Sequence, residues 1–260
     1  MPFLLLKRLW PCAKDMGRYT LLPKRDPMSS HIFFDHARTA RIGLPEAVYC
    51  QGKAFESLLE LLQRFGRSSQ RPILFTRLAP EVFARVPEDL QKEYDYHPLS
   101  RTAYGLRMPD YPHGSVAVVS AGTADGFVTW EAARTLEYLG IACDVYEDCG
   151  VAGLWRLEKR LPEINAHDAV IVVAGLDAAL ASVLGGLTPK PLFAVPSSVG
   201  YGTASGGMTA LNSMLASCAP GLGIFNIDNG YGAACAAARV LHAIYGLPRL
   251  PDSGLAEKDS

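Results

Sequence analysis

The second half of the sequence, from about Ser115 onward, predicts an α/β domain in which helices cover both faces of a five-stranded parallel sheet. Five short apolar segments alternate with five segments whose apolar residues recur at helical spacing. The segments at residues 170–174 and 192–195 are apolar without alternation, as expected of strands that are buried on both faces. Each apolar segment is followed by a loop rich in Gly, Ser, Asp or Asn.

The expected elements follow one another without a break through this half. Strands are expected at Val116–Ser120, Ala142–Tyr146, Ala169–Ala174, Pro191–Val195 and Gly223–Ile227. Helices are expected at Asp125–Leu139, Leu154–Ile164, Ala178–Leu184, Gly207–Ser217 and Asn229–Tyr245. Strands that alternate with helices in this way join through right-handed crossovers into a doubly wound parallel sheet. We therefore expect an α/β domain over residues 113–248 and a tail over residues 249–260.

The first half is less regular. Apolar residues lie at helical spacing in KAFESLLELLQRF (Lys53–Phe65), which ends at Gly66. A strand is expected at Ile73–Thr76 and one further helix at Pro80–Gln91, whereas the prolines and glycines of Tyr104–Gly114 indicate a linker. These elements predict a small α+β domain over residues 31–112, preceded by a poorly defined segment over residues 1–30.

Composition excludes several classes of protein. A chain of 260 residues suffices for one large or two small domains, and its formal net charge of −1 provides no basic surface for nucleic acid. No apolar run reaches the roughly 20 residues that span a bilayer, so membrane insertion is not expected. The six cysteines show neither a CxxC motif nor the spacing of a disulfide scaffold, so a reduced cytoplasm is the expected location.

The loops that follow the five strands are the candidate binding site, because ligands in such sheets bind beyond the carboxyl ends of the strands. Small residues let backbone N–H groups approach an anion, although turns and helix caps need the same residue types. Five such loops along one edge favour a ligand site over isolated caps. Neither GxGxxG nor GxxxxGK[ST] occurs. The candidate residues are Gly122, Thr123, Asp125, Gly150, Ser197, Ser198, Gly200, Tyr201, Gly202, Asp228 and Asn229.

Two further features have both a functional and a structural interpretation. The segment SSVGYGTASGG (Ser197–Gly207) is longer than a usual connection between a strand and a helix, which favours a mobile substrate loop. Cys218 follows an expected helix and precedes the last strand, so its loop should lie at the sheet edge opposite the carboxyl ends. On position alone, an inert thiol at a helix end is the simpler interpretation.

A charged segment near the start of the first domain could bind phosphate. Arg38, Arg41 and Lys53 are suitable phosphate ligands, but they could equally form a solvated surface with Asp35 and Glu46. Spacing alone leaves these two interpretations open.

Several long motifs, in order, resemble the LarB family of nickel-pincer nucleotide cofactor biosynthesis proteins. They are GTADGFVTWEAARTLEYLG, DCGVAGLWRL, VVAGLDAALASVLGGL, VPSSVGYGTASGGMTALNSMLASCAPG and NIDNGYGA. The segment DHARTARIGLPEAVYCQGK resembles the family's N-terminal motif, so the resemblance covers about residues 35–245. More distantly, the second half is similar to the PurE mutase, also related to AIR carboxylases. That similarity implies a flavodoxin-like sheet and a homo-octamer.

The resemblance implies an activity and roles for particular residues. The family converts nicotinic acid adenine dinucleotide and CO2 or bicarbonate to pyridinium-3,5-biscarboxylic acid mononucleotide and AMP, assisted by a divalent metal, expected to be Mg2+. Cys218 would supply the thiolate and Asp177 would be the base. Arg38, Arg41 and Lys53 would bind the dinucleotide phosphates. Asp125 and the loop 197–202 would line the pocket.

Departures from the family pattern keep two alternatives open. Ala124 replaces a serine, Asp177 replaces a glutamate and Trp155 replaces a histidine. These changes would suit a nucleotide-binding regulator that has lost turnover. A mutase acting on aminoimidazole ribotide would need a histidine after the second strand, and residues 147–156 contain none. If Cys218 is catalytic, its loop must meet the strand ends of another subunit or fold over to its own.

Overall fold

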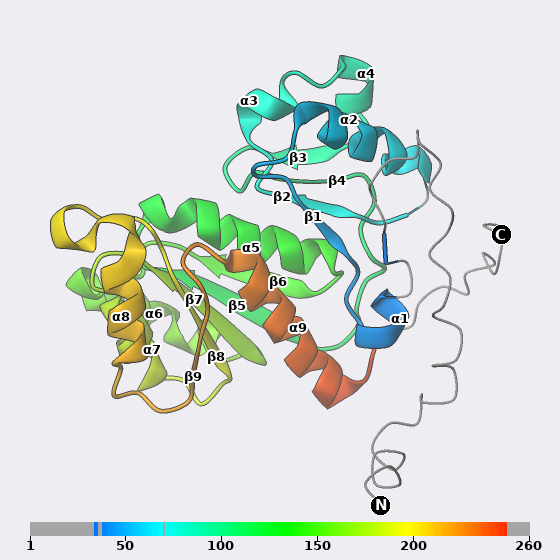
Figure 1. The fold of residues 1–260 in the computed structure, drawn as a ribbon. Coiled ribbons are helices and arrows are strands. Elements are labelled where there is room, and N and C mark those ends of the chain that lie inside the picture. Colours follow the sequence, from blue (N-terminus) through cyan, green and yellow to red (C-terminus); the bar gives the residue numbers. More distant parts are fainter. Residues whose placement is uncertain (1–33, 36–37, 70, 249–260) are drawn as a thin grey trace, which may run out of the picture. The chain divides into compact units, whose positions relative to one another are not determined.

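The computed structural model describes residues 34–35, 38–69 and 71–248, so the expectations for residues 1–30, Cys12 and residues 249–260 fall outside it. The described residues from Asp35 onward form one compact unit that contains two sheets (Figure 1). No helix in this part of the chain is long and apolar enough to cross a membrane.

The larger sheet has five strands in the order β6-β5-β7-β8-β9, and every neighbouring pair is parallel. The strands are β5 (Ser115–Ser120), β6 (Ala142–Tyr146), β7 (Ala169–Ala174), β8 (Leu192–Pro196) and β9 (Leu222–Ile224). Val118 in β5 pairs with Val145 on one side and with Ile171 on the other. The expected five-stranded parallel α/β fold, with flavodoxin-like strand order, is therefore confirmed.

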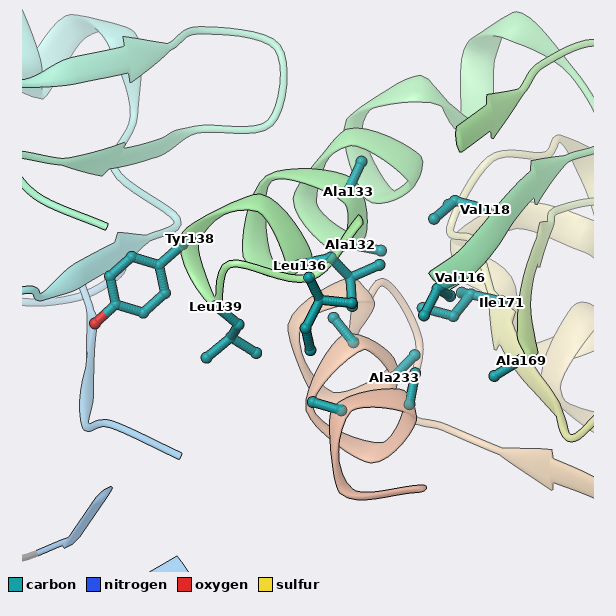
Figure 2. Close-up of a cluster of buried hydrophobic side chains, with 14 of the residues drawn as sticks. Val116, Val118, Ala132, Ala133, Leu136, Tyr138, Leu139, Ala169, Ile171 and Ala233 are labelled. Carbon is teal, nitrogen blue, oxygen red and sulfur yellow. The ribbon is translucent and has the colours of Figure 1, made fainter. Parts of the chain in front are cut away.

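Helices cover both faces of this sheet because successive side chains of a strand point to opposite sides. One face carries α5 (Gly126–Tyr138) and α9 (Gly230–Tyr245), and the other carries α6 (Leu154–Ile164), α7 (Ala179–Gly185) and α8 (Met208–Leu215). Figure 2 shows Leu136 and Ala233 against Val116 and Ile171 on the first face. All six residues of β7 are buried, which accounts for its uninterrupted apolar sequence.

The smaller sheet has the order β1-β2-β4-β3, with β1 parallel to β2 and the other pairs antiparallel. Its strands are β1 (Ala47–Tyr49), β2 (Leu74–Thr76), β3 (Asp95–His97) and β4 (Thr102–Tyr104). The helices of this region are α1 (Arg38–Ile42), α2 (Phe55–Arg64), α3 (Pro80–Phe83) and α4 (Glu88–Gln91). In α2, Leu58, Leu61 and Leu62 are buried, as the helical spacing predicted.

Two expectations for the first half are wrong. The single helix at Pro80–Gln91 is two short helices, because Pro87 cannot continue a preceding helix and instead precedes α4. The segment Tyr104–Gly114 is not a free linker, because Tyr104 ends β4 and Met108 and Tyr111 are buried. The N–H of Met108 donates to the carbonyl of Tyr138 at the end of α5, over 2.8 Å. Strands β1, β3 and β4 were not predicted.

Candidate functional site at the carboxyl ends of the parallel strands

The order of the large sheet creates a switch point between β5 and β7. The chain leaves β5 toward β6 on one side and then returns to β7 on the other, so the loops after β5 and β7 diverge there.

Neighbouring loops pack closely around this switch point. Leu176 N–H donates to Val199 C=O over 2.9 Å, and a Cβ added to Gly175 would lie 2.3 Å from that oxygen. A Cβ on Gly150 would lie 2.7 Å from the carbonyl of Ala121. Glycine at these positions therefore permits close approach of backbones.

Asp125 is the buried carboxyl group of this edge, with only 3% of its surface exposed. Its Oδ2 accepts a hydrogen bond from Gly122 N–H over 2.9 Å. Burial raises the pKa of Asp125, and Asp228 raises it further, while Gly122 N–H, the Ser197 hydroxyl and Gly175 N–H lower it. No hydrogen bond of normal geometry reaches Oδ1 from the described residues. Asp125 therefore has one carboxylate oxygen held by Gly122 N–H and a second oxygen that can still accept a hydrogen bond.

Asp228 links the loops after β8 and β9. Its Oδ1 accepts a hydrogen bond from Ser198 N–H over 2.7 Å, and its own N–H donates to Pro196 C=O over 2.8 Å. Its φ of 58° lies in the left-handed region, which aspartate tolerates better than most residues. The next residue, Asn229, accepts from Gly232 N–H over 2.8 Å and thereby caps α9. A structural role therefore already accounts for Asn229.

Strained backbone is concentrated near this edge. Among the described residues other than glycine, positive φ occurs at Arg77, Arg101, Asp148, Leu176, Ala178 and Asp228. Four of these residues lie in the loops that follow β6, β7 and β9. Such conformations cost of order 1–3 kcal/mol each and tend to cluster at functional sites. The observation therefore supports this edge as the candidate site.

A cavity of about 320 Å3 connects the strand-end loops with the smaller sheet. It is lined by Gln51, Arg77, Leu99, Ser100, Arg101, Phe127, Glu131, Ser198 and Asp228. An adjacent cavity of about 270 Å3 shares Gln51, Arg77 and Arg101 with it and adds Lys53. Of the predicted site residues, these cavities bring together Lys53, Ser198 and Asp228.

An ion pair between Arg77 and Glu131 forms part of the cavity wall. Arg77 Nε lies 2.8 Å from Glu131 Oε1, and only 4% of the Glu131 side chain is exposed. Burial raises the pKa of Glu131, and the guanidinium of Arg77 opposes this effect. Arg77 also donates to the carbonyl of Asp228, and Tyr231 N–H donates to Glu131 Oε2. Sequence reasoning missed both residues. For Glu131, the sequence offered one signal of a buried ion pair, namely a glutamate on the apolar face of the expected helix Asp125–Leu139.

Cys218 lies at the opposite edge of the sheet, in the connection between α8 and β9. The preceding Ser217 hydroxyl lies 2.6 Å from that of Ser182 in α7. The following Ala219 packs beside Gly185, where α7 ends. Cys218 is exposed there and, within this chain, is remote from the strand-end loops.

The other described cysteines differ from Cys218 because they are partly or fully buried. Burial raises the pKa of Cys50 and Cys143 to about 12 and that of Cys235 to about 11, and it also raises the pKa of Cys149. Thiols with such pKa values remain protonated near neutral pH and are poor nucleophiles.

The remaining predicted phosphate ligands lie away from the two cavities. Arg41 forms an ion pair with Asp35. Burial raises the pKa of Tyr231 and of Cys235, and Arg38, in α1, lies close enough to both groups to oppose that effect. Neither arginine lines the cavities described above.

The other predicted residues lie in the strand-end loops themselves. Asp177 is exposed after β7, and its Oδ1 accepts from Ala179 N–H over 3.4 Å. Thr123 begins a short 3-10 turn after β5. After β8, Gly200 and Gly202 flank Tyr201, which is 82% exposed. Their arrangement gives this edge an exposed carboxylate and an exposed aromatic side chain.

Within the described ranges, no group of three or more His, Cys, Asp or Glu residues could hold a metal ion. Mg2+ is often held instead by one or two carboxylates together with substrate phosphates. Asp228, which lines the cavity, suits that manner of binding.

The fold is a doubly wound parallel α/β domain joined to a second, smaller domain, with the candidate site at the carboxyl ends of the parallel strands. Residues 115–246 match the family model for AIR carboxylase, and residues 29–107 match the model for the LarB/PurE-like N-terminal domain. An uncharacterized protein of Methanocaldococcus jannaschii is 32% identical over 235 residues, which cover 84% of this chain and 88% of that protein. The chain belongs to the LarB family.

Proposed function

We propose that this protein carboxylates the pyridinium ring of nicotinic acid adenine dinucleotide and hydrolyses its phosphoanhydride. The products are pyridinium-3,5-biscarboxylic acid mononucleotide and AMP. The observation that carries the proposal is the cavity of about 320 Å3, to which both the LarB-type domain and the AIR carboxylase-like domain contribute. A dinucleotide needs two binding regions, and the adjacent cavity of about 270 Å3 supplies the second.

The reaction requires a nucleophile because a pyridinium ring is electron-poor and does not attack CO2. A thiolate that adds to a ring carbon breaks the aromaticity and leaves an enamine. The electron pair of the enamine makes the remaining meta carbon nucleophilic, and this carbon forms a bond to CO2. A base then removes the proton from that carbon, and the thiolate leaves with the electrons of the C–S bond, which restores the ring.

Cys218 is the proposed thiol. Its exposure supports this role, as does the high pKa of the buried cysteines in the described part of the chain. Its distance from the strand-end loops of its own chain leads us to propose that a neighbouring subunit receives it. The protein would then act as a homo-oligomer, and by family resemblance as an octamer.

The acid–base and phosphate-binding roles follow from the exposed and charged groups. Asp177 is the proposed base because its carboxylate is exposed on the loop after β7. Lys53 is the proposed phosphate ligand that lines a cavity. When bound with the diphosphate, Mg2+ would neutralise charge at the scissile bridge. Asp228 would be its protein ligand.

Mass spectrometry tests the activity directly. Purified protein would be incubated with nicotinic acid adenine dinucleotide, bicarbonate and Mg2+, and AMP and the dicarboxylated mononucleotide would be measured. We expect both products from the wild type and no carboxylated product from Cys218→Ala, whose circular dichroism should be unchanged. Full activity of Cys218→Ala would exclude the thiol mechanism.

A second candidate function is a nucleotide-binding regulator without turnover. Ala124 and Asp177 depart from the family pattern, and Trp155, which replaces a histidine, is 66% exposed at the start of α6. Binding of the dinucleotide without either product in the same experiment would favour this function.

A further inference from the structure

Residues 191–227 include no charged side chain and no histidine, although charged residues make up 20% of the chain. They form β8, the loop 197–207, α8 and β9. Strand β8 is largely buried, so its lack of charge is expected, but α8 and the loops on either side of it reach the surface. Depletion of charged residues distinguishes the core of a protein interface from the remaining surface. The composition therefore favours a surface that another molecule covers.

The outer side of α8 carries a row of apolar side chains. Met208, Leu211 and Leu215 recur at the i, i+3, i+7 spacing that places residues on one face of a helix. Ala210 and Met214 are buried, whereas Met208 is 53% exposed and Leu215 is 63% exposed. Single exposed apolar residues are ordinary at a surface, but a row along one helix is an unpartnered face. We call Met208, Leu211 and Leu215 the α8 stripe.

The two ends of α8 adjoin different parts of the proposed site. At its start, the Thr209 hydroxyl donates to the carbonyl of Thr203 over 2.6 Å, which fastens the loop 197–207 to the first turn of the helix. Cys218 follows the other end of the helix. Because α8 has eight residues, it is about 12 Å long. Within one chain, the length of α8 therefore separates Cys218 from this loop.

We infer that the α8 stripe packs antiparallel against the α8 stripe of a second copy of this chain, across a two-fold axis near Leu211. Antiparallel packing reverses the ends of the helix, so Cys218 of each chain lies beside the loop 197–207 of the other. This inference deepens the proposed function by naming the surface through which a neighbouring subunit receives the thiol. The catalytic meaning of the exchange rests on that function, whereas the interface itself does not.

The absence of charge favours a second copy over a different partner. A two-fold axis places each surface opposite itself, so a charged helix would repel its own copy. Residues 191–227 contain no such charge. In the antiparallel arrangement, Met208 of one helix lies opposite Leu215 of the other, and the polar residues beside the stripe, Asn212 and Ser213, are uncharged. An acidic or basic partner would find no complementary charge here, so the surface suits its own copy best.

Analytical ultracentrifugation of the full chain tests the interface. The wild type should sediment as a dimer or as a larger assembly of dimers. Leu215→Glu should lower this mass at least about twofold, because the new carboxylate would be buried opposite Met208 without a partner. Ile244→Glu is the matched control, because Ile244 is 57% exposed on α9, and it should keep the wild-type mass. A monomeric wild type, or a wild-type mass for Leu215→Glu, would overturn the inference.

A disulfide across the axis tests the antiparallel packing without a destabilising charge. The double variant Leu211→Cys, Cys218→Ala would be oxidised with copper phenanthroline and run on a non-reducing gel. We expect a covalent dimer, because a residue near the two-fold axis faces its own copy. Cys218→Ala alone is the control and should run as a single chain. Failure of the double variant to cross-link would overturn the inference.

These outcomes are independent of turnover. An assembly that requires the α8 stripe but carboxylates no dinucleotide would support the interface and contradict the proposed function. Turnover by a wild type that sediments as a monomer would overturn the interface and leave the proposed activity intact.

Discussion

Arg77 and Glu131, which are 54 residues apart in the sequence, form an ion pair with a distance of 2.8 Å between Nε and Oε1. Arg77 follows β2 of the smaller sheet, and Glu131 belongs to α5 of the parallel domain. Arg77 also donates to the carbonyl of Asp228. One side chain therefore joins the smaller sheet, α5 and the loop before α9.

Replacement of Arg77 by Ala should destabilise the protein because it leaves the buried Glu131 carboxylate without its partner. Removing one partner of a buried pair costs about 3–5 kcal/mol, so we expect a loss of unfolding free energy of about 3 kcal/mol. Chemical denaturation measures this loss. Arg107→Ala, which breaks an exposed pair with Asp110, is the control and should cost under about 1 kcal/mol. Similar losses for both variants would contradict the prediction.

Gly175→Ala should separate the loops after β7 and β8. The added Cβ would lie 2.3 Å from the carbonyl of Val199, which is backbone and cannot rotate away. We expect a destabilisation of about 1–3 kcal/mol, together with weaker dinucleotide binding. Gly186→Ala is the control, because the nearest atom to its added Cβ is 3.5 Å away. Thermal unfolding of the two variants measures the contrast, and equal melting temperatures would refute it.

Stability should fall as the pH decreases below about 6.5, in part because of His167. Burial lowers the pKa of His167 despite the opposing charges of Asp144 and Asp168, while Lys190 lowers it further. Its ring nitrogens lie 2.9 Å from the Ser115 hydroxyl and 3.1 Å from the Tyr146 hydroxyl.

The direction of this change in stability follows from the difference in proton binding between the folded and the unfolded protein. The unfolded chain, with a histidine pKa near 6.5, takes up a proton more readily than the folded protein. The contribution of His167 is therefore complete above about pH 6.5 and is lost as pH falls toward the lowered pKa. Denaturation across this range should show a shallower fall in stability for His167→Gln than for the wild type. An identical slope in the two proteins would rule out His167 as the cause.

The parallel sheet could be predicted because each strand carries its own signal. The uninterrupted apolar run of β7 can be buried on both faces only if the strand lies between two layers of helices. The strands β1, β3 and β4 have three residues each, too few to show a period, and their pairing depends on partners that are distant in the sequence. The same reason explains why Tyr104 was assigned to a linker, although it is a buried strand residue.

The candidate site was predictable only in part. Ser198 and Asp228 follow strands and line the cavity, because topology brings strand ends together. Arg77, Arg101 and Glu131 could not be foreseen, since they meet through the packing of α5 against the smaller sheet, which no local spacing encodes. Arg38 and Arg41 looked equally suitable in sequence. In the structure, Arg41 pairs with Asp35 and Arg38 lies near the start of α9.

The two hydrogen-bonding groups of Asp228 have a kinetic consequence. Its carbonyl accepts a hydrogen bond from Arg77, and its carboxylate accepts one from Ser198 N–H, so Asp228 connects two other residues that line the cavity of about 320 Å3. Separation of Arg77 from Ser198 would break at least one of these contacts. We therefore predict that a mutation that accelerates hydrogen exchange in β2 also shortens the residence time of a ligand bound in this cavity.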